Sequence, residues 1–421
     1  MAAAIVLLLL LCAGLGVPLF AVLGAGSLLA AHASGLDPAI LVIELNRLAS
    51  SPNLLAIPLF TFAGVVLAHG GAPQRLVALF NALLGWLPGG LASVALCSCA
   101  FFTAFSGASG ITIMALGGLL LPMLEAVGYP ERYSLGLLTA SGSLGLLFPP
   151  SLAVLLYGIV AGVDIDQLFR AGLLPGAILL LMLLAYAGYK GIHARIPRHP
   201  FRLAEAARAL RAGLWDLLLP AGILLGIFGG FVTVSEAAAG TAAYVLVLES
   251  VIHRNLHWGR DLWRVVRDTS VLVGSILIIL GIAMGLTNLL VDAQIPGRLL
   301  SAIERHVHSP LGFLMLLNLL LLGVGAMMDI FSAIVVVVPL ILPLTHRYGI
   351  DPVHLGIILL ANLEIGYATP PVGINLFIAS QRFHRPVLAL FRAAVPFLAI
   401  MLLWLLILTY VPAVSLWWRS G

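Results

Sequence analysis

Residues 145–150 read Gly-Leu-Leu-Phe-Pro-Pro, and residues 366–371 read Gly-Tyr-Ala-Thr-Pro-Pro, so one kind of interruption recurs 221 positions further along the chain. The first interruption lies within residues 133–163, a 31-residue stretch that carries no charge. Two consecutive prolines remove two backbone hydrogen-bond donors, so a helix cannot continue through them unchanged. Each interruption therefore predicts a discontinuous helix inside a membrane.

The composition places the whole chain in a membrane. Of its 421 residues, 62% are hydrophobic and 9% are charged, whereas soluble domains carry about 25% charged residues. The abundant apolar surface also excludes a disordered chain. The net charge of +4 is explained by basic cytoplasmic loops better than by nucleic-acid binding. We therefore expect an all-α, polytopic membrane protein.

A second kind of interruption predicts re-entrant hairpins. Residues 76–124 contain no charged side chain over 49 positions, and a single helix of that length would reach about 73 Å. The stretch is broken at Pro88-Gly89-Gly90 and again, in its middle, at Ser106-Gly107-Ala108-Ser109-Gly110. We therefore expect the chain to turn inside the membrane and leave by the side it entered. A second hairpin is expected over residues 310–346, turning within residues 323–329.

Other apolar stretches predict simple membrane crossings, each of which needs about 20 apolar residues. These stretches are residues 5–31, 54–68, 173–189, 214–232, 237–252, 271–290 and 387–411. The first stretch lacks a basic segment before it, so it is interpreted as membrane structure and not as a cleaved signal peptide.

Glycines and prolines recur at one offset across the two halves of the chain. Besides the two double prolines, the pairs separated by 221 positions are Pro122 with Pro343, Gly128 with Gly349, Gly145 with Gly366 and Pro175 with Pro396. Chance matches of Gly and Pro are common in such a composition, but a register held over this length is not. It indicates a tandem structural repeat.

Loop charges predict that the two repeats are inverted. Residues 190–213 carry a net charge of +5 and residues 253–268 carry +2, so both loops should face the cytoplasm. Residues 162–170 carry −1, which suits the outside, whereas their counterparts at residues 382–392 carry +3, which suits the inside. Equivalent loops then lie on opposite sides, as in the inverted-topology repeats of secondary transporters.

This organisation divides the chain into five predicted segments. They are residues 1–87, the scaffold and interfacial arm of the first repeat; 88–172, its hairpin and broken helix; 173–308, scaffold spans, basic loops and the second arm; 309–386, the second hairpin and broken helix; and 387–421, a C-terminal span.

The hairpin turns and helix breaks are the predicted binding sites. Backbone groups freed there must be buried in protein or bind a ligand, and oxygen ligands suit an alkali cation such as Na⁺. The Na⁺-binding candidates are Ser106, Gly107, Ser109, Gly145, Phe148 and Pro149 in the first repeat, and Gly325, Met328, Asp329, Gly366, Thr369, Pro370 and Gly373 in the second. Tight helix packing by small residues is the alternative explanation. No organic cofactor is expected.

A few polar side chains within apolar stretches are candidates for contacting substrate. These candidates are Ser106, Ser332, Asn375 and Glu364. Asp329 could bind a cation, or it could cap the second arm of its hairpin. Glu364 could line the transport pathway, or it could be satisfied by a polar neighbour or be protonated. Glu236, at the expected start of a helix, is interpreted as a local cap or a subunit contact.

One motif raises a different class of function. Gly107-Ala108-Ser109-Gly110 resembles the serine motif of rhomboid intramembrane proteases. A serine hydrolase would need a base at the same depth as Ser109. The nearest histidines are His69 and His354, and both are expected near the ends of spans. We treat the hydrolase as a remote alternative and expect the protein not to be an enzyme.

Three segments carry a resemblance that covers nearly the whole chain. They are residues 142–151 (Gly-Ser-Leu-Gly-Leu-Leu-Phe-Pro-Pro-Ser), 157–163 (Tyr-Gly-Ile-Val-Ala-Gly-Val) and 362–373 (Asn-Leu-Glu-Ile-Gly-Tyr-Ala-Thr-Pro-Pro-Val-Gly). With Met328-Asp329 and residues 235–238, they resemble the large membrane subunit, the DctM-like permease, of tripartite ATP-independent periplasmic (TRAP) transporters. Val234-Ser235 departs from the usual Pro-Thr, which weakens any role inferred for that loop.

The resemblance implies a Na⁺-coupled importer of organic acids, such as dicarboxylates or sugar acids, in the bacterial inner membrane. The implied partners are a small four-helix membrane subunit, expected as a separate chain, a periplasmic substrate-binding protein, the organic acid and membrane lipid. The hairpins and broken helices would move as an elevator against a scaffold, with residues 73–87 and 295–306 as interfacial arms. A Na⁺/carboxylate symporter of similar architecture that needs no binding protein is the main alternative.

Overall fold

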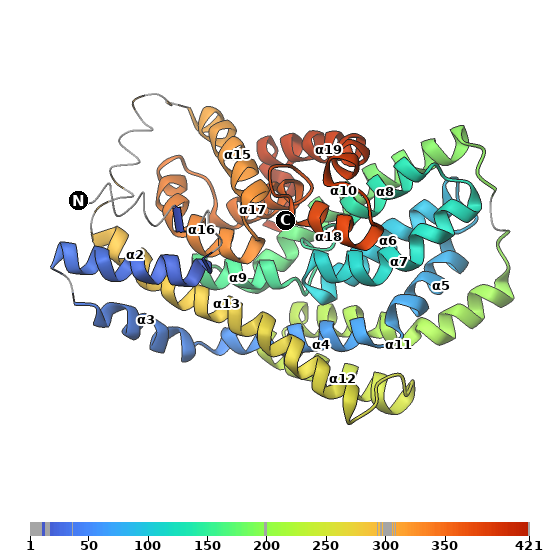
Figure 1. Ribbon diagram of the computed structural model, residues 1–421, viewed down its shortest axis with the longest axis horizontal. Coiled ribbons are helices and arrows are strands. Elements are labelled where there is room, and N and C mark those ends of the chain that lie inside the picture. Colours follow the sequence, from blue (N-terminus) through green and yellow to red (C-terminus); the bar gives the residue numbers. More distant parts are fainter. Residues whose placement is uncertain are drawn as a thin grey trace.

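The computed structural model describes residues 11–12, 17–35, 37–197, 200–292, 294, 297, 305, 307 and 309–419. This part of the chain is helical and contains no β-strand. Eight of its helical segments are long and apolar enough to cross a membrane. The prediction of an all-α polytopic membrane protein is therefore confirmed. Figure 1 shows the helices of the two hairpins and broken helices above a layer that contains α2, α3, α4, α11, α12 and α13.

The first repeat contains the predicted hairpin and broken helix. Its helices are α4 (Ala56–His69), α5 (Ala72–Leu84), α6 (Gly90–Ser106), α7 (Ser109–Val127), α8 (Glu131–Ser141), α9 (Leu152–Ala161) and α10 (Ile165–His193). The turn between α6 and α7 depends on Gly107, which has a φ of +64° and whose Cβ atom, if present, would lie 2.4 Å from the Leu152 side chain. A β-carbon is disfavoured there on both grounds.

The second repeat has the same order of elements as α6–α10 of the first. It comprises α15 (Pro310–Met327), α16 (Ile330–Arg347), α17 (Pro352–Gly366), α18 (Ile374–Phe383) and α19 (Val387–Tyr410). The hairpin turn is at Met328-Asp329, so the predicted turn region was too wide: Gly323 and Gly325 lie inside α15. The chain stays helical there because glycine lowers helix stability by only about 1 kcal/mol.

The helices of the two repeats contact one another reciprocally. The second hairpin arm of each repeat packs on the second half of the other's broken helix, since α7 contacts α18 and α16 contacts α9. Likewise α8 contacts α19, and α17 contacts α10. Such exchanged contacts are expected when two similar halves are related by a two-fold axis. The orientation of each repeat relative to the two sides of the membrane stays a prediction.

The remaining helices lie in the segments that were predicted to form the scaffold, and we use this name for them. Alongside α4, they are α2 (Leu19–Ser34), α3 (Ala39–Ala49), α11 (Leu203–Phe228), α12 (Val234–Val247) and α13 (Arg260–Asp292). The helix α13 contacts α2, α3 and α4, and α12 contacts α4. Six of the seven predicted crossings fall on helices, and the seventh begins before the described residues. The predicted second arm, residues 295–306, lies almost wholly outside the described residues.

The first arm, α5, is tied to the scaffold by a buried ion cluster. The Arg75 guanidinium donates to both carboxylate oxygens of Asp216 on α11, at 2.7 and 2.8 Å. It also donates to Glu249, which follows α12. Burial lowers the pKa of Arg75, but the hydrogen bonds to Asp216 and Glu249 outweigh this effect and leave the pKa above its ordinary value. The cluster connects residues far apart in sequence.

Candidate functional site

The first hairpin tip is held by hydroxyl groups. The hydroxyl of Thr103 on α6 lies 2.7 Å from that of Thr112 on α7, and it donates to the carbonyl oxygen of Gly142 at 2.8 Å. Ser106 lies 3.4 Å from Thr112 and from the carbonyl oxygen of Ala108. All three side chains are buried. The tip is therefore joined directly to the break that follows α8.

Gly145 brings this break against the backbone of α6. A Cβ atom at this position would lie 2.3 Å from the carbonyl oxygen of Ala100 and 2.4 Å from the backbone nitrogen of Ala104. Only glycine permits such an approach without displacing one of the segments. The predicted residues of the first repeat thus lie together, with Phe148 and Pro149 ending the same break.

Asp329 caps the second hairpin arm. One carboxylate oxygen accepts hydrogen bonds from the backbone nitrogens of Phe331 and Ser332, both at 3.0 Å, and the other accepts from the Ser332 hydroxyl. The hydroxyl of Tyr367 accepts from the backbone nitrogen of Ile330. The predicted capping role is therefore confirmed, and the negative charge remains at the tip beside the N-terminus of α16.

The helix break of the second repeat packs closely on the hairpin tip of the same repeat, as in the first repeat. The carbonyl oxygen of Ala326 accepts from the backbone nitrogens of Val372 and Gly373, both at 3.0 Å. A Cβ atom on Gly366 would lie 2.4 Å from the carbonyl carbon of Gly325. The Thr369 hydroxyl donates to the carbonyl oxygen of Ile365 at 2.9 Å.

A single cavity of about 990 Å³ lies where both tips and both breaks meet the scaffold. Gly107, Ala108 and Ser109 line it from the first tip, and Asp329, Ile330 and Ser332 from the second. Leu146 lines the cavity from the first break and Tyr367 from the second, and residues of α4 and α13 form the scaffold wall. The size falls within the range of about 300–1,000 Å³ that is usual for ligand sites.

The cavity receives the N-termini of three helices. Ser109, Ile330 and Ile374 begin α7, α16 and α18, and all three residues line the cavity. Helix N-termini carry a partial positive charge, so they attract anions. The first three N–H groups of α16 are already bonded to Tyr367 and Asp329, whereas α7 and α18 have no side-chain cap. No Lys or Arg is among the described residues that line the cavity. An anionic ligand would therefore be recognised there mainly by backbone dipoles.

The predicted site residues divide into three groups. Gly107, Ser109, Asp329 and Ser332 line the cavity directly. A second group lies beside the lining residues in the same tips and breaks: Ser106, Gly145, Phe148, Pro149, Gly325, Met328, Gly366, Thr369, Pro370 and Gly373. Glu364 and Asn375 are fully buried and do not line the cavity, and their side-chain polar atoms have no hydrogen-bond partner among the described residues.

Several residues of the site were not predicted from the sequence. Thr103 and Thr112 lie three positions before Ser106 and three after Ser109, so helical spacing could have identified them. Tyr367 lies between two predicted residues. His69 and Asp268 line the cavity from α4 and α13, and their side chains are 3.2 Å apart. No local pattern connects those two, because they are 199 positions apart.

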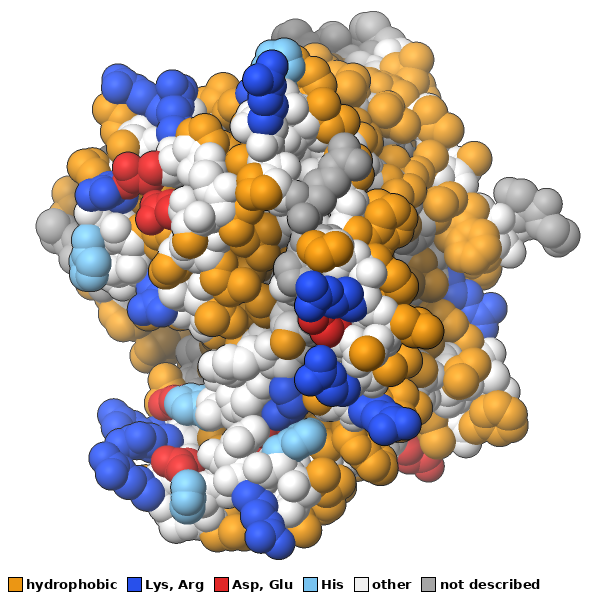
Figure 2. Space-filling model, turned by 90° about the vertical axis from the view of Figure 1, so that its right-hand side faces the viewer, with side chains coloured by type: hydrophobic (Ala, Val, Ile, Leu, Met, Phe, Trp, Pro, Cys, Tyr) orange, Lys and Arg blue, Asp and Glu red, His pale blue; other side chains and the backbone are white. Residues whose placement is uncertain are grey.

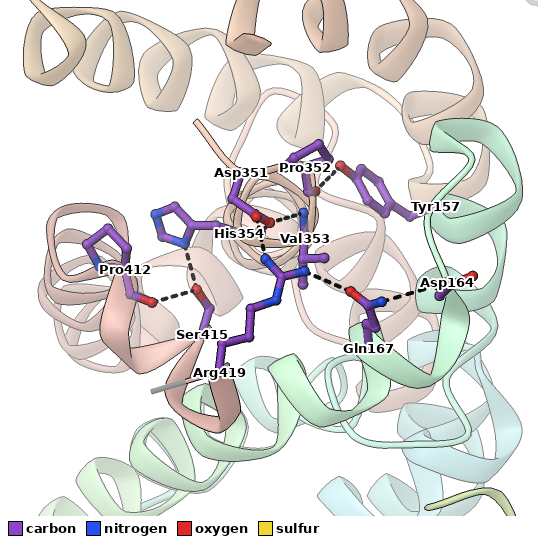
Figure 3. Close-up of polar contacts among 10 residues, drawn as sticks. All are labelled: Tyr157, Asp164, Gln167, Asp351, Pro352, Val353, His354, Pro412, Ser415 and Arg419. Atoms are coloured by element: carbon purple, nitrogen blue, oxygen red, sulfur yellow. Dashed lines mark hydrogen bonds and ion pairs between the residues drawn. The ribbon is translucent and has the colours of Figure 1, made fainter. Parts of the chain in front are cut away.

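The two histidines considered for a hydrolase occupy different places. His69 shares the cavity with Ser109, but no hydrogen bond joins the two among the described contacts. His354 is buried in the first turn of α17, where its Nδ1 atom lies 2.7 Å from the Ser415 hydroxyl (Figure 3). Among the described residues, no base is therefore hydrogen-bonded to the Ser109 hydroxyl.

Figure 3 also shows how the C-terminal segment is fixed to both repeats. Arg419, in the short helix Trp417–Arg419, donates to Asp351 and, at 2.7 Å, to Gln167 at the start of α10. Asp351 caps α17 by accepting from the backbone nitrogen of Val353 at 2.7 Å. This network is structural and lies away from the cavity.

Glu236 has the capping role expected for it. The Glu236 carboxylate accepts from the backbone nitrogen of Thr233 at 2.7 Å, while the Thr233 hydroxyl accepts from the Glu236 backbone nitrogen at 3.3 Å. This reciprocal arrangement is a capping box at the start of α12.

A solved structure shares this fold. The Alcanivorax borkumensis YdaH transporter aligns with a TM-score of 0.53 over 90% of this chain and 87% of its own, at 17% sequence identity. At that identity the likeness concerns the fold alone.

Sequence comparisons identify the family. The model of the tripartite ATP-independent periplasmic transporter DctM component matches residues 4–414. The C4-dicarboxylate TRAP transporter large permease protein of Pseudomonas aeruginosa is 36% identical over 89% of this chain and 88% of its own length. The protein of the same name from Vibrio cholerae is 33% identical over 98% of this chain and 97% of its own length. The isethionate TRAP transporter permease protein DctMQ of Oleidesulfovibrio alaskensis is 34% identical over 96% of this chain, which spans 64% of that protein.

These relatives are named as transporter permeases and not as enzymes. With its eight apolar helices among the described residues, this chain is a multi-pass protein of the bacterial inner membrane and belongs to the DctM family, the large permease subunits of TRAP transporters.

Proposed function

We propose that this chain is the membrane permease of a Na⁺-coupled importer of organic acids, such as dicarboxylates or sugar acids. In this proposal a periplasmic binding protein delivers the substrate and a small four-helix membrane subunit completes the scaffold. The family works with a small membrane subunit and a periplasmic binding protein. Three relatives carry the names of C4-dicarboxylate or isethionate transporters, and these substrates are anions.

The observation that carries the proposal is the convergence of three helix N-termini on one cavity. Asp329 already caps α16, so the uncapped N-termini of α7 and α18 are the ones that suit a carboxylate. The described lining contains no Lys or Arg, which leaves these two termini as the main attraction. The apolar residues Ile276, Ile279 and Ile378 line the rest of the cavity. They would accept the carbon chain of an organic acid.

The two tips have the donor chemistry that Na⁺ requires. In the first repeat, Thr103, Ser106 and Thr112 bring hydroxyl oxygens together with backbone carbonyls. In the second, Asp329 supplies a carboxylate close to Ser332, and Thr369 lies in the adjoining break. Hard oxygen donors of this kind suit an alkali cation. A bound Na⁺ would offset the negative charge of Asp329 and join each tip to its break.

Coupling to Na⁺ would follow from this arrangement. The same tips that would hold the cations also present helix N-termini to the cavity. A cation that orders a tip therefore also orders the substrate-binding surface, and the two ligands would bind with positive coupling. Movement of the hairpins and broken helices past α4 and α13 would then carry both ligands across the membrane.

Transport in reconstituted vesicles tests the proposal. The ligand of the partner binding protein is first identified by thermal-shift screening with organic acids, and its radiolabelled form is then used for uptake. We expect uptake only with an inward Na⁺ gradient, the small subunit and the loaded binding protein. Uptake that persists without the binding protein would reject the tripartite mechanism in favour of an independent symporter.

Single substitutions test the cation sites. We expect Ser106→Ala and Thr369→Ala to lower the apparent Na⁺ affinity of uptake by about tenfold or more, because a hydrogen bond or contact to a charged group is worth about 1.5–3 kcal/mol. Ser275→Ala is the matched control, since this hydroxyl lines the same cavity from the scaffold and donates to the carbonyl oxygen of Leu272. An unchanged Na⁺ dependence in both test variants would exclude these sites.

A further inference from the structure

A second cavity, of about 390 Å³, lies between α8, α10 and α19, apart from the tips and breaks. Three of its lining residues, Arg132, Lys190 and His193, carry nitrogen donors. Among the described residues that line it there is no Asp or Glu. Glu131, the nearest acid in sequence, is paired with Arg385 at 2.7 Å and does not neutralise the cavity. The cavity is therefore electropositive.

Aromatic rings form the rest of the wall. Tyr129 stacks on Tyr133 with ring centroids 5.3 Å apart, and Tyr133 and Tyr186 both contact Phe397 of α19, at 5.6 and 5.3 Å. The Tyr133 hydroxyl is buried and has no hydrogen-bond partner in the described part of the chain. Such a group is costly unless a ligand or water bonds to it.

The cations are placed so that they can still bind a ligand. The ammonium group of Lys190 lies 5.7 Å above the centroid of the Tyr186 ring, with no acidic partner among the described contacts. Arg132 donates one nitrogen to the carbonyl oxygen of Arg392 at 3.2 Å, which orients the guanidinium and leaves further donors. The cavity thus combines oriented donors with an apolar wall.

This cavity lies at one end of α10, a helix long and apolar enough to cross a membrane. Lys190 and His193 lie in the last turn of α10, directly before a basic stretch of sequence at residues 194–202. This end of α10 lies at the upper right of Figure 1. Figure 2 shows that end of the molecule, where Lys and Arg side chains exceed Asp and Glu on a largely hydrophobic face. An excess of basic residues marks the cytoplasmic side.

We propose that this cavity binds the phosphate headgroup of an anionic phospholipid from the cytoplasmic leaflet. Arg132 and Lys190 would contact the phosphate, and the Tyr133 hydroxyl would donate to one of its oxygens. The Phe397 ring and Pro396 would pack against the start of the acyl chains. Basic pockets between transmembrane helices on this side are typical of such lipid sites. The lipid would connect α8 of the first repeat with α19 of the second.

A free anion such as inorganic phosphate shares the headgroup's chemistry but not its apolar part. The aromatic wall of the cavity and its place at the membrane surface favour the lipid. The two sources are distinguished by competition: inorganic phosphate at millimolar concentration is expected not to displace the lipid.

Native mass spectrometry of the full chain, released from nanodiscs of phosphatidylglycerol and phosphatidylethanolamine, tests the proposal. The wild type is expected to retain one phosphatidylglycerol molecule selectively. Arg132→Gln combined with Lys190→Gln should weaken retention about 25-fold, since each cation near a membrane surface contributes about fivefold in affinity. Arg208→Gln with Arg211→Gln is the matched control, because it removes the same charge from exposed positions on α11 and should leave retention unchanged.

Tyr133→Phe provides an independent variant that removes only the hydroxyl. It is expected to weaken retention about two- to tenfold, and it keeps the aromatic wall if the double variant does not fold. Equal retention in Tyr133→Phe and in the double variant compared with the wild type would overturn the proposal. Displacement of the lipid by inorganic phosphate would overturn the assignment to a phospholipid. Neither result depends on transport or on Na⁺ coupling.

Discussion

Gly366→Ala is expected to force α17 away from α15 and to destabilise the protein. A Cβ atom at position 366 would lie 2.4 Å from the carbonyl carbon of Gly325 and 2.6 Å from its Cα atom, whereas ordinary contact begins at 3.4 Å. Both atoms belong to the backbone and cannot rotate aside. Because interiors are close-packed, the two segments must separate by about 1 Å.

The separation also affects the hydrogen bonds beside the second tip. The carbonyl oxygen of Ala326 accepts from Val372 and Gly373 at 3.0 Å, and a shift of about 1 Å would take both beyond hydrogen-bonding range. Overpacking costs about 1–3 kcal/mol, and each lost hydrogen bond costs about 0.5–1.5 kcal/mol. The free energy of unfolding should therefore fall by about 2–6 kcal/mol.

Thermal unfolding of the purified protein in detergent measures this effect. Gly274→Ala is the control, because Gly274 is also helical and a Cβ atom there would meet nothing within 4 Å. Alanine favours helix over glycine by about 1 kcal/mol, so this variant should unfold at or above the wild-type midpoint. If Gly366→Ala unfolds at the same temperature as Gly274→Ala, the close contact between α17 and α15 is wrong.

Two further substitutions test the scaffold. Arg75→Met should lower the free energy of unfolding by about 3–5 kcal/mol, because it leaves the carboxylates of Asp216 and Glu249 buried without their cation. Chemical unfolding measures this loss, and a change below about 1 kcal/mol would contradict the buried cluster. Thr233→Ala should cost about 1 kcal/mol through loss of the N-cap of α12. Thr233→Ser, which keeps the capping hydroxyl, should restore most of that loss, and equal midpoints for the two variants would argue against the capping box.

The broken helices and hairpins could be predicted closely because local chemistry determines them. The double prolines cannot continue a helix, and the structure ends α8 at Ser141 and begins α9 at Leu152, on either side of the predicted break. Gly107 turns the first hairpin for an equally local reason, its positive φ. The width of the second turn was predicted less well, since Gly325 is tolerated inside α15.

Contacts between distant residues could not be predicted in the same way. Arg75, Asp216 and Glu249 form one cluster from three separate segments, and no spacing connects them. Glu364 and Asn375 show the converse. Their position in apolar stretches suggested a substrate pathway, but both side chains are fully buried and neither residue is among those that line the cavity. Whether a polar side chain faces a cavity depends on how its helix is rotated against its neighbours.

The sequence by itself determined that the chain is a membrane protein, where its helices break and that its two halves correspond. These properties follow from backbone donors, apolar length and the spacing of Gly and Pro, each of which acts within a few residues. Only the tertiary structure decided that both tips, both breaks and three helix N-termini share one cavity. That convergence depends on the close packing of the two halves, where Gly145 and Gly366 permit backbone contact and Arg75 fixes the arm to the scaffold.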